Sequence, residues 1–447
     1  MERNLTTGSV FQNLLYFSLP YMLSFFLQTL YGMADLFIIG QFHDTACITA
    51  VSIGSQTMHM LTVMIVGLAM GATVTIGRAV GEGNGKKAAN IIGNAATVFL
   101  LGALILMAAL LLFVGPIVSV MSTPDQAVLG TRRYLTICFL GIPFITAYNV
   151  LSSVFRGLGD SKSPMCFIAV ACAVNIALDY LLIGGFGMGP EGAALGTVLS
   201  QTVSVVAAFF VMRKKKAGIF IKKSDFKLQR AATLPILKIG VPVALQDGFI
   251  QIAFLVITVI ANSRGLHDAA AVGIVEKVIG VMFLIPSSML SAVSALAAQN
   301  LGANEAYRAR LTLRYAIWIT VGFGIVMSVL AQFKAEAVIG IFEKDAQVIR
   351  LGGQYLKSYV WDCIFAGVHF CYSGYFCACG HSGISFFHNS VSIIFVRIPV
   401  AYWASKAFSD TLFPMGVAAP AGSALSVLIC VAADFMLRDY NFKRKGS

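Results

Sequence analysis

Two aspartates and an asparagine lie inside long hydrophobic runs, where charged side chains are costly. Asn175 and Asp179 are four residues apart in the run 165–186, so on a helix they share one face. Asp35 lies inside a second run, 21–39. A carboxylate at the centre of a membrane helix costs about 2.5–3.5 kcal/mol on insertion scales, and such residues usually serve binding or transport. The pattern indicates a cation site shared by two helices.

Asn149 and Thr197 also lie in hydrophobic runs and add hydroxyl and amide oxygens to this set. Together with Asp35, Asn175 and Asp179 they offer hard oxygen ligands for Na⁺, or carboxylates that can carry H⁺. The alternative is that each polar group forms a hydrogen bond between helices as part of the packing. That alternative stays open for the asparagines and Thr197, whereas the insertion cost favours a functional role for the aspartates.

A soft-metal site is the next possibility, because His369, Cys377 and His381 follow each other at spacings of eight and four. Zinc ligands normally come as clustered pairs from two segments, and no second cluster is present in the sequence. We therefore expect no metal and no organic cofactor, with H⁺ or Na⁺ as the bound ion.

Further polar residues lie in other hydrophobic runs and could line a cavity. Glu276 and Lys277 are adjacent, so on a helix they face different directions. Arg397 could be a cavity cation or a partner of Asp362, although snorkelling or structural pairing would also explain it. The candidate cavity residues are Gln28, Tyr31, Gln246, Gln251, Glu276, Asp362 and Arg397.

The elements that position these residues are predicted from composition. Of the 447 residues, 58% are hydrophobic and only 12% are charged, which is typical of a multi-pass membrane protein. Runs of about 20 or more apolar residues predict membrane-spanning helices. Twelve such runs lie at 14–39, 50–76, 88–121, 130–155, 165–186, 192–212, 234–261, 270–297, 312–342, 348–376, 384–408 and 415–437. We predict an all-α fold with twelve transmembrane helices.

The formal net charge of +12 comes from basic residues spread over the connections between these runs. Most of them fall in connections on the same side as the N-terminus, with the greatest number in 213–230. The positive-inside rule explains this distribution more simply than nucleic acid binding does. We predict that both termini are cytoplasmic and that the partners are the lipid bilayer and small molecules, with no nucleic acid.

The basic segment also divides the chain into two similar halves. We predict an N-terminal six-helix lobe at 1–212, a cytoplasmic linker at 213–232 and a C-terminal six-helix lobe at 233–447. Because each half has an even number of helices, the two repeats run in the same direction about a pseudo-two-fold axis along the membrane normal. When one half is aligned on the other at a constant offset, matching residues recur: Val51 with Val272, Gly81 with Gly302, and Ala88 with Ala309.

The repeat is not preserved at the acidic residues. At the same offset, Asp35 corresponds to Val256 and Asp179 to Val400. Residues that only support the architecture should have similar counterparts in both halves. The asymmetry favours a function located in the N-terminal lobe.

Three local motifs stand out: MADLFIIG at 33–40, RGLGDSKSP at 156–164 and PEGAALGT at 190–197. They resemble motifs of the multidrug and toxic compound extrusion (MATE) transporters of the MOP flippase superfamily. The resemblance extends over essentially the whole length and favours the prokaryotic DinF-like branch. It implies that Asp35, Asn149, Asn175, Asp179 and Thr197 form the cation site of that branch. Gln251 and Ala366 stand where another branch has carboxylates.

The resemblance also implies a function. We expect a monomeric secondary active exporter of organic, often cationic, compounds in the bacterial inner membrane. It would use H⁺ or Na⁺ antiport with rocker-switch alternating access. A flippase for a lipid-linked precursor is the alternative, but pyrophosphate recognition needs several cationic side chains, and only Lys277 and Arg397 are candidates. No catalytic constellation such as His-Glu-x-x-His is present, so we expect no enzyme activity.

Overall fold

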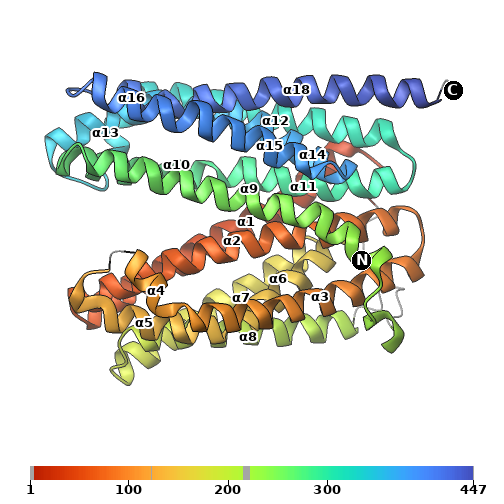
Figure 1. Cartoon of the computed structure of the whole chain (residues 1–447), viewed down its shortest axis with the longest axis horizontal. Coiled ribbons are helices and arrows are strands. Elements are labelled where there is room, and N and C mark those ends of the chain that lie inside the picture. Colours follow the sequence, from red (N-terminus) through yellow and green to blue (C-terminus); the bar gives the residue numbers. More distant parts are fainter. Residues whose placement is uncertain (1–4, 122, 215–221, 446–447) are drawn as a thin grey trace. The chain divides into compact units, whose positions relative to one another are not determined.

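The computed structural model describes residues 5–121, 123–214 and 222–445, and the described chain is helical with no strand (Figure 1). The chain forms two compact units. Unit 1 comprises the described residues of Met1–Gly8, Leu15–Ala244 and Ala298–Asn304, and unit 2 comprises Ser9–Leu14, Leu245–Ala297 and the described residues of Glu305–Ser447. The predicted linker at 213–232 falls partly outside the described residues, and the predicted lobe boundaries stay a prediction.

Unit 1 holds the helices of the N-terminal half, except for the first residues of α1, Val10–Leu14, which belong to unit 2. Within it α2 packs against α3, α5 and α6, and α8 packs against α5, α6 and α7. The elements are α1 (Val10–Phe42), α2 (Thr45–Gly81), α3 (Gly85–Leu112), α4 (Val114–Val120), α5 (Asp125–Leu140), α6 (Ile142–Gly157), α7 (Lys162–Asp179), the π-helix η1 (Tyr180–Gly185), α8 (Pro190–Lys214) and the 3-10 helix η2 (Lys223–Phe226).

Unit 2 holds most of the helices of the C-terminal half. Within it α14 packs against α12 and α18, and α13 packs against α10 and α12. The elements are α9 (Arg230–Asn262), α10 (Leu266–Met282), α11 (Leu284–Gly302), α12 (Ala306–Ile339), α13 (Ala346–Tyr359), α14 (Asp362–Cys379), α15 (Ser382–Ser392), the π-helix η3 (Ile393–Arg397), α16 (Ile398–Ala407), α17 (Phe413–Gly416) and α18 (Ala418–Lys445). The first part of α9 and the end of α11 belong to unit 1.

The helices account for the predicted membrane spans. Among the described residues, ten are long and apolar enough to cross a membrane, and the pair α5 and α6, bent by 49°, makes an eleventh. The predicted span at 348–376 corresponds to α13 and α14, which are separated by a short break. The mean hydropathy of α13 is low because polar residues follow one side of this helix, namely Gln347, Arg350, Gln354 and Lys357. The all-α, multi-pass prediction is confirmed.

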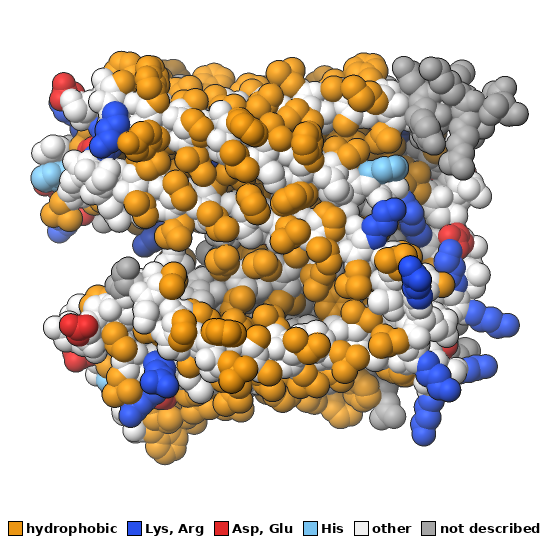
Figure 2. Space-filling model, viewed as in Figure 1, with side chains coloured by type: hydrophobic (Ala, Val, Ile, Leu, Met, Phe, Trp, Pro, Cys, Tyr) orange, Lys and Arg blue, Asp and Glu red, His pale blue; other side chains and the backbone are white. Residues whose placement is uncertain are grey.

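The exterior has the composition expected for contact with lipid. Hydrophobic side chains cover most of the face in Figure 2, and lysines and arginines lie mainly towards the helix ends. Large apolar side chains such as Ile105, Trp318 and Phe333 are more than 70% exposed. Exposed apolar surface on this scale is unusual for a soluble protein but normal for one surrounded by a bilayer.

Two π-helical segments interrupt otherwise regular helices beside buried charged residues. In unit 1, η1 begins directly after Asp179, and in unit 2, η3 ends at Arg397. π-helices are rare and often occur at functional sites. The fifth predicted span of each half therefore departs from α-helical geometry beside a charge.

Asn94 fastens η2 to α3. Its side-chain Nδ2 donates to the carbonyl of Asp225 at 3.0 Å, and its Oδ1 accepts from the backbone N–H of Gln229 at 2.7 Å. Thr97 of α3 adds a hydrogen bond to the carbonyl of Phe226 at 2.8 Å. Within unit 1, these contacts hold the residues that precede α9 against α3.

Candidate cation site

Asp35 of α1 is joined to α8 by a hydrogen bond. Thr197 Oγ1 donates to Asp35 Oδ2 at 3.2 Å, and the aspartate is only 2% exposed. The second carboxylate oxygen, Oδ1, is buried and has no hydrogen-bond partner among the described residues. A buried carboxylate with a free oxygen can bind a proton or a cation there.

Asp179 and Asn175 supply the other side of the site from the end of α7. Both are fully buried, and their side chains lie beside the carboxyl group of Asp35. Gly196 of α8 packs directly against them: a Cβ atom at this position would overlap Asp179 Oδ1 and lie 3.5 Å from Asn175 Nδ2. Glycine therefore allows α8 to approach the acidic end of α7.

The site has more polar atoms than protein partners. In the described chain, no hydrogen bond reaches either carboxylate oxygen of Asp179 or either side-chain polar atom of Asn175. The hydroxyl of Tyr31 lies beside Thr197 and Gln201 and also lacks a hydrogen bond of good geometry. Buried polar groups are normally satisfied, so unsatisfied ones in one place indicate a site for a ligand or ion.

The chemistry that this arrangement allows follows from its charges. Two carboxylates side by side repel each other when both are ionised, and one bound proton or cation relieves the repulsion. The surrounding oxygens of Thr197, Tyr31 and Asn175 suit Na⁺ as well as H⁺. The arrangement therefore suits the binding and release of one small cation, either H⁺ or Na⁺.

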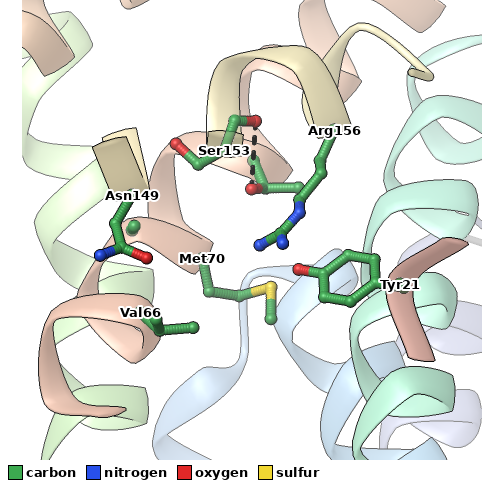
Figure 3. A pocket seen from close by; sticks show the side chains of 8 residues that line it. Tyr21, Val66, Met70, Asn149, Ser153 and Arg156 are labelled. Carbon is green, nitrogen blue, oxygen red and sulfur yellow. Dashed lines mark hydrogen bonds between the residues drawn. The ribbon is translucent and has the colours of Figure 1, made fainter. Parts of the chain in front are cut away.

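Asn149 does not contact the other four predicted site residues through any hydrogen bond that the structure shows. It lies on α6, where Nδ2 donates to the carbonyl of Ile145 at 2.8 Å. Its side chain lines a small pocket that also contains Tyr21, Ser153 and Arg156 (Figure 3). The structure thus brings Asp35, Asn175, Asp179 and Thr197 together and places Asn149 in this pocket.

The predicted cavity residues of the C-terminal half form a separate polar group in unit 2. Glu276 Oε2 accepts from Thr258 Oγ1 at 3.3 Å, and Nη2 of Arg397 donates to the hydroxyl of Tyr359. The ion pairs found in the described part of the chain do not include Arg397 with Asp362. Arg397 still interacts electrostatically with Asp362 and Glu276.

The remaining candidates have fewer contacts. Gln246 is buried and its Oε1 has no partner within the described chain, while Gln28 and Gln251 are half-buried. Lys277 is exposed, whereas the adjacent Glu276 is half-buried, as expected for neighbours on a helix.

Two residues of the site were missed in the sequence. Gly196 has no chemistry of its own, and only its contact with Asp179 shows its role. Gln201 is buried one turn after Thr197, with Oε1 unpartnered among described atoms. The i, i+4 spacing from Thr197 was a usable signal for Gln201.

Comparison with known proteins agrees with this architecture. The MatE family model matches the chain twice, over residues 20–181 and 242–403, once in each half. YpnP of Bacillus subtilis, a probable multidrug resistance protein, is 29% identical over 436 residues, which cover 97% of this chain and 96% of that protein. The multidrug export protein MepA of Staphylococcus aureus is 26% identical over 380 residues, which cover 83% and 82%.

Solved structures share the fold. A MATE transporter in complex with MaL6 gives a TM-score of 0.90 at 19% identity, covering 99% of both chains. The outward-facing conformation of a multidrug resistance MATE family transporter of the MOP superfamily gives 0.91 at 20% identity, covering 98% of both chains. The predicted MATE-like fold is therefore confirmed. With the two matches to the family model, the chain belongs to the MatE family of multi-pass membrane transporters and is not an enzyme.

Proposed function

We propose that this chain is a secondary active exporter of organic, often cationic, compounds, driven by inward movement of H⁺ or Na⁺. The observation that carries the proposal is the pair of buried carboxylates, Asp35 and Asp179, on different helices with unpartnered oxygens around them. Relatives that are named for multidrug resistance or multidrug export support it.

Coupling requires that ion and substrate favour different states of the transporter. The ionised pair Asp35 and Asp179 attracts an organic cation. A proton or Na⁺ at the pair removes that attraction and lets the substrate leave. Alternating access follows from rocking of the two lobes, with the ion and the substrate bound in turn.

The proposed setting is the bacterial plasma membrane, with a monomeric chain and both termini in the cytoplasm. The basic connections support this orientation because positive residues concentrate on the cytoplasmic side. A cysteine introduced at Ser224 should resist an impermeant thiol reagent added to intact cells. Labelling from outside would contradict the orientation.

Efflux from proteoliposomes tests the function directly. The purified chain is reconstituted, loaded with a fluorescent organic cation, and given a pH gradient or a Na⁺ gradient separately. We expect one of the two gradients to accelerate export and the absence of a gradient to leave only slow leakage. No response to either gradient would contradict coupled export. Movement of a lipid-linked pyrophosphate without cation efflux would favour the flippase alternative.

A further inference from the structure

Arg156 is a buried cation with no acidic partner among the residues that the structure describes. It lies at the end of α6, is only 6% exposed, and its guanidinium carbon is 3.8 Å from the centroid of the Tyr21 ring. None of the ion pairs in the described residues involves it. A buried charge is normally balanced by an opposite charge because desolvation without one is expensive. The ring of Tyr21 offsets part of this cost and supplies no negative charge.

The guanidinium group points into the small pocket in Figure 3. The other lining residues contain no acid: they are Tyr21, Val66, Ala69, Met70, Thr73, Asn149 and Ser153. Thr73, Ser153 and Asn149 already donate to backbone carbonyls, Thr73 to that of Ser153 at 3.2 Å and Ser153 to that of Val150 at 2.7 Å. The groups left to bind a ligand are the N–H donors of Arg156 and the hydroxyl of Tyr21. This donor set suits an anion.

The size of the pocket limits the anion. It has room for about one water-sized group. A water molecule would supply no negative charge to Arg156, whereas a small monovalent anion supplies one within the room beside the guanidinium. A halide ion is only slightly larger than water, and the flexible side chain of Met70 can move to provide the extra room.

We propose that this pocket of unit 1 is a binding site for a small monovalent anion, chloride in ordinary salt solutions, held by the guanidinium of Arg156 and the hydroxyl of Tyr21. The anion balances the buried positive charge at the end of α6. This site would bind an anion, whereas the pair Asp35 and Asp179 would bind a cation. The proposal does not depend on the proposed export activity. Its chemistry is that of a structural or modulatory anion site.

Thermal unfolding of the purified full-length chain in detergent tests the site. Melting temperatures are measured in chloride, bromide, phosphate and gluconate at constant ionic strength. Because a ligand that binds only the folded state stabilises it, chloride and bromide should raise the melting temperature above that in gluconate. Arg156→Gln should abolish the difference between halide and gluconate, and Tyr21→Phe should reduce it. Arg133→Gln is the matched control, since Arg133 pairs with Glu191 and is exposed, and it should keep the full difference.

Crystals of the unsubstituted chain grown in bromide give an independent measurement, which remains informative if Arg156→Gln fails to fold. We expect an anomalous peak within hydrogen-bond distance of the Arg156 guanidinium. Equal melting temperatures in halide and gluconate, or a full halide effect in Arg156→Gln, would overturn the proposal. Stabilisation by phosphate alone, dependent on Arg156, would overturn it in favour of a phosphate group.

Discussion

Gly196 of α8 lies directly against the carboxylate of Asp179, so that a Cβ atom at position 196 would overlap Oδ1. The contact positions two elements at once, because the next residue, Thr197, donates to Asp35 from the same turn of α8. The spacing between the two aspartates is therefore set by a residue that contributes no polar side chain.

Replacing Gly196 by alanine should damage the site while leaving the fold. The methyl group must displace Asp179 or push α8 away, and overpacking of this kind costs about 1–3 kcal/mol. We expect a lower melting temperature and the loss of most gradient-driven efflux. Gly102→Ala is the control, since Gly102 is a helical glycine of α3 with no atom within 4 Å of its Cβ position. Normal transport by Gly196→Ala would show that the contact is unimportant.

Asp35→Asn and Asp179→Asn should each abolish gradient-driven efflux without preventing folding or insertion. Asparagine keeps the size of the side chain but removes its charge, as permanent protonation would. Insertion should become easier because a buried charge is removed. Expression, binding of a cationic substrate and efflux are measured on the same two variants.

The outcomes separate the possible roles of the aspartates. Aspartates with a structural role only would allow both variants to transport normally. Loss of folding would instead indicate pairing with a buried cation, because the partner would be left alone. Normal expression combined with no response to a gradient is the result expected from a coupling site.

The helices were predictable because the membrane requires long apolar runs, and the positions of Asp35, Asn175 and Asp179 stood out against them. Asn175 and Asp179 were correctly assigned to one helix face from their spacing. The breaks in α5–α6 and α13–α14 were not predicted. Hydropathy is an average over a window and does not report a change of direction within it.

The partners across helices were less predictable. Asn149 was grouped with the acidic residues, yet it lines the pocket with Arg156. Arg156 falls one residue after the predicted span 130–155, whereas the structure includes it in the last turn of α6 and buries it over Tyr21. Spacing along one helix fixes which residues share a face, but it does not fix which face of another helix lies opposite.

Asn94→Ala should release η2 from α3. The change removes the hydrogen bonds that Asn94 makes to the carbonyl of Asp225 and from the N–H of Gln229, and a hydrogen bond of this kind contributes about 0.5–1.5 kcal/mol. We expect a lower melting temperature and faster cleavage by a protease near residues 223–229. Asn90→Ala is the control, because Asn90 has only a long side-chain contact with Asn94, at 3.5 Å. Equal cleavage rates in both variants would contradict the role of Asn94.

Asp345 caps the N-terminus of α13 in the connection before it, outside the predicted spans. Its Oδ1 accepts from the backbone N–H groups of Val348 at 3.0 Å and Gln347 at 2.8 Å. These hydrogen bonds lower the pKa of Asp345 below its ordinary value, the bond from Val348 most strongly. The folded state thus favours the ionised carboxylate. The stabilisation from its charge is complete above the unfolded-state pKa of about 3.9 and is lost as the pH falls through the lower folded-state pKa.

Asp345→Ala should therefore lower the melting temperature at neutral pH and have a smaller effect in acid. The expected result is a difference between the original chain and the variant that is constant from neutral pH down to about 5 and shrinks below about 3.9. Thermal unfolding across this range measures it. Asp410→Ala is the control, since Asp410 lies in another exposed connection and, among the described residues, its side chain accepts only from the adjacent Ser409; it should show little difference at any pH. A difference for Asp345→Ala that stayed constant into acid would mean that the charge of the cap contributes nothing and that only helix propensity or packing has changed.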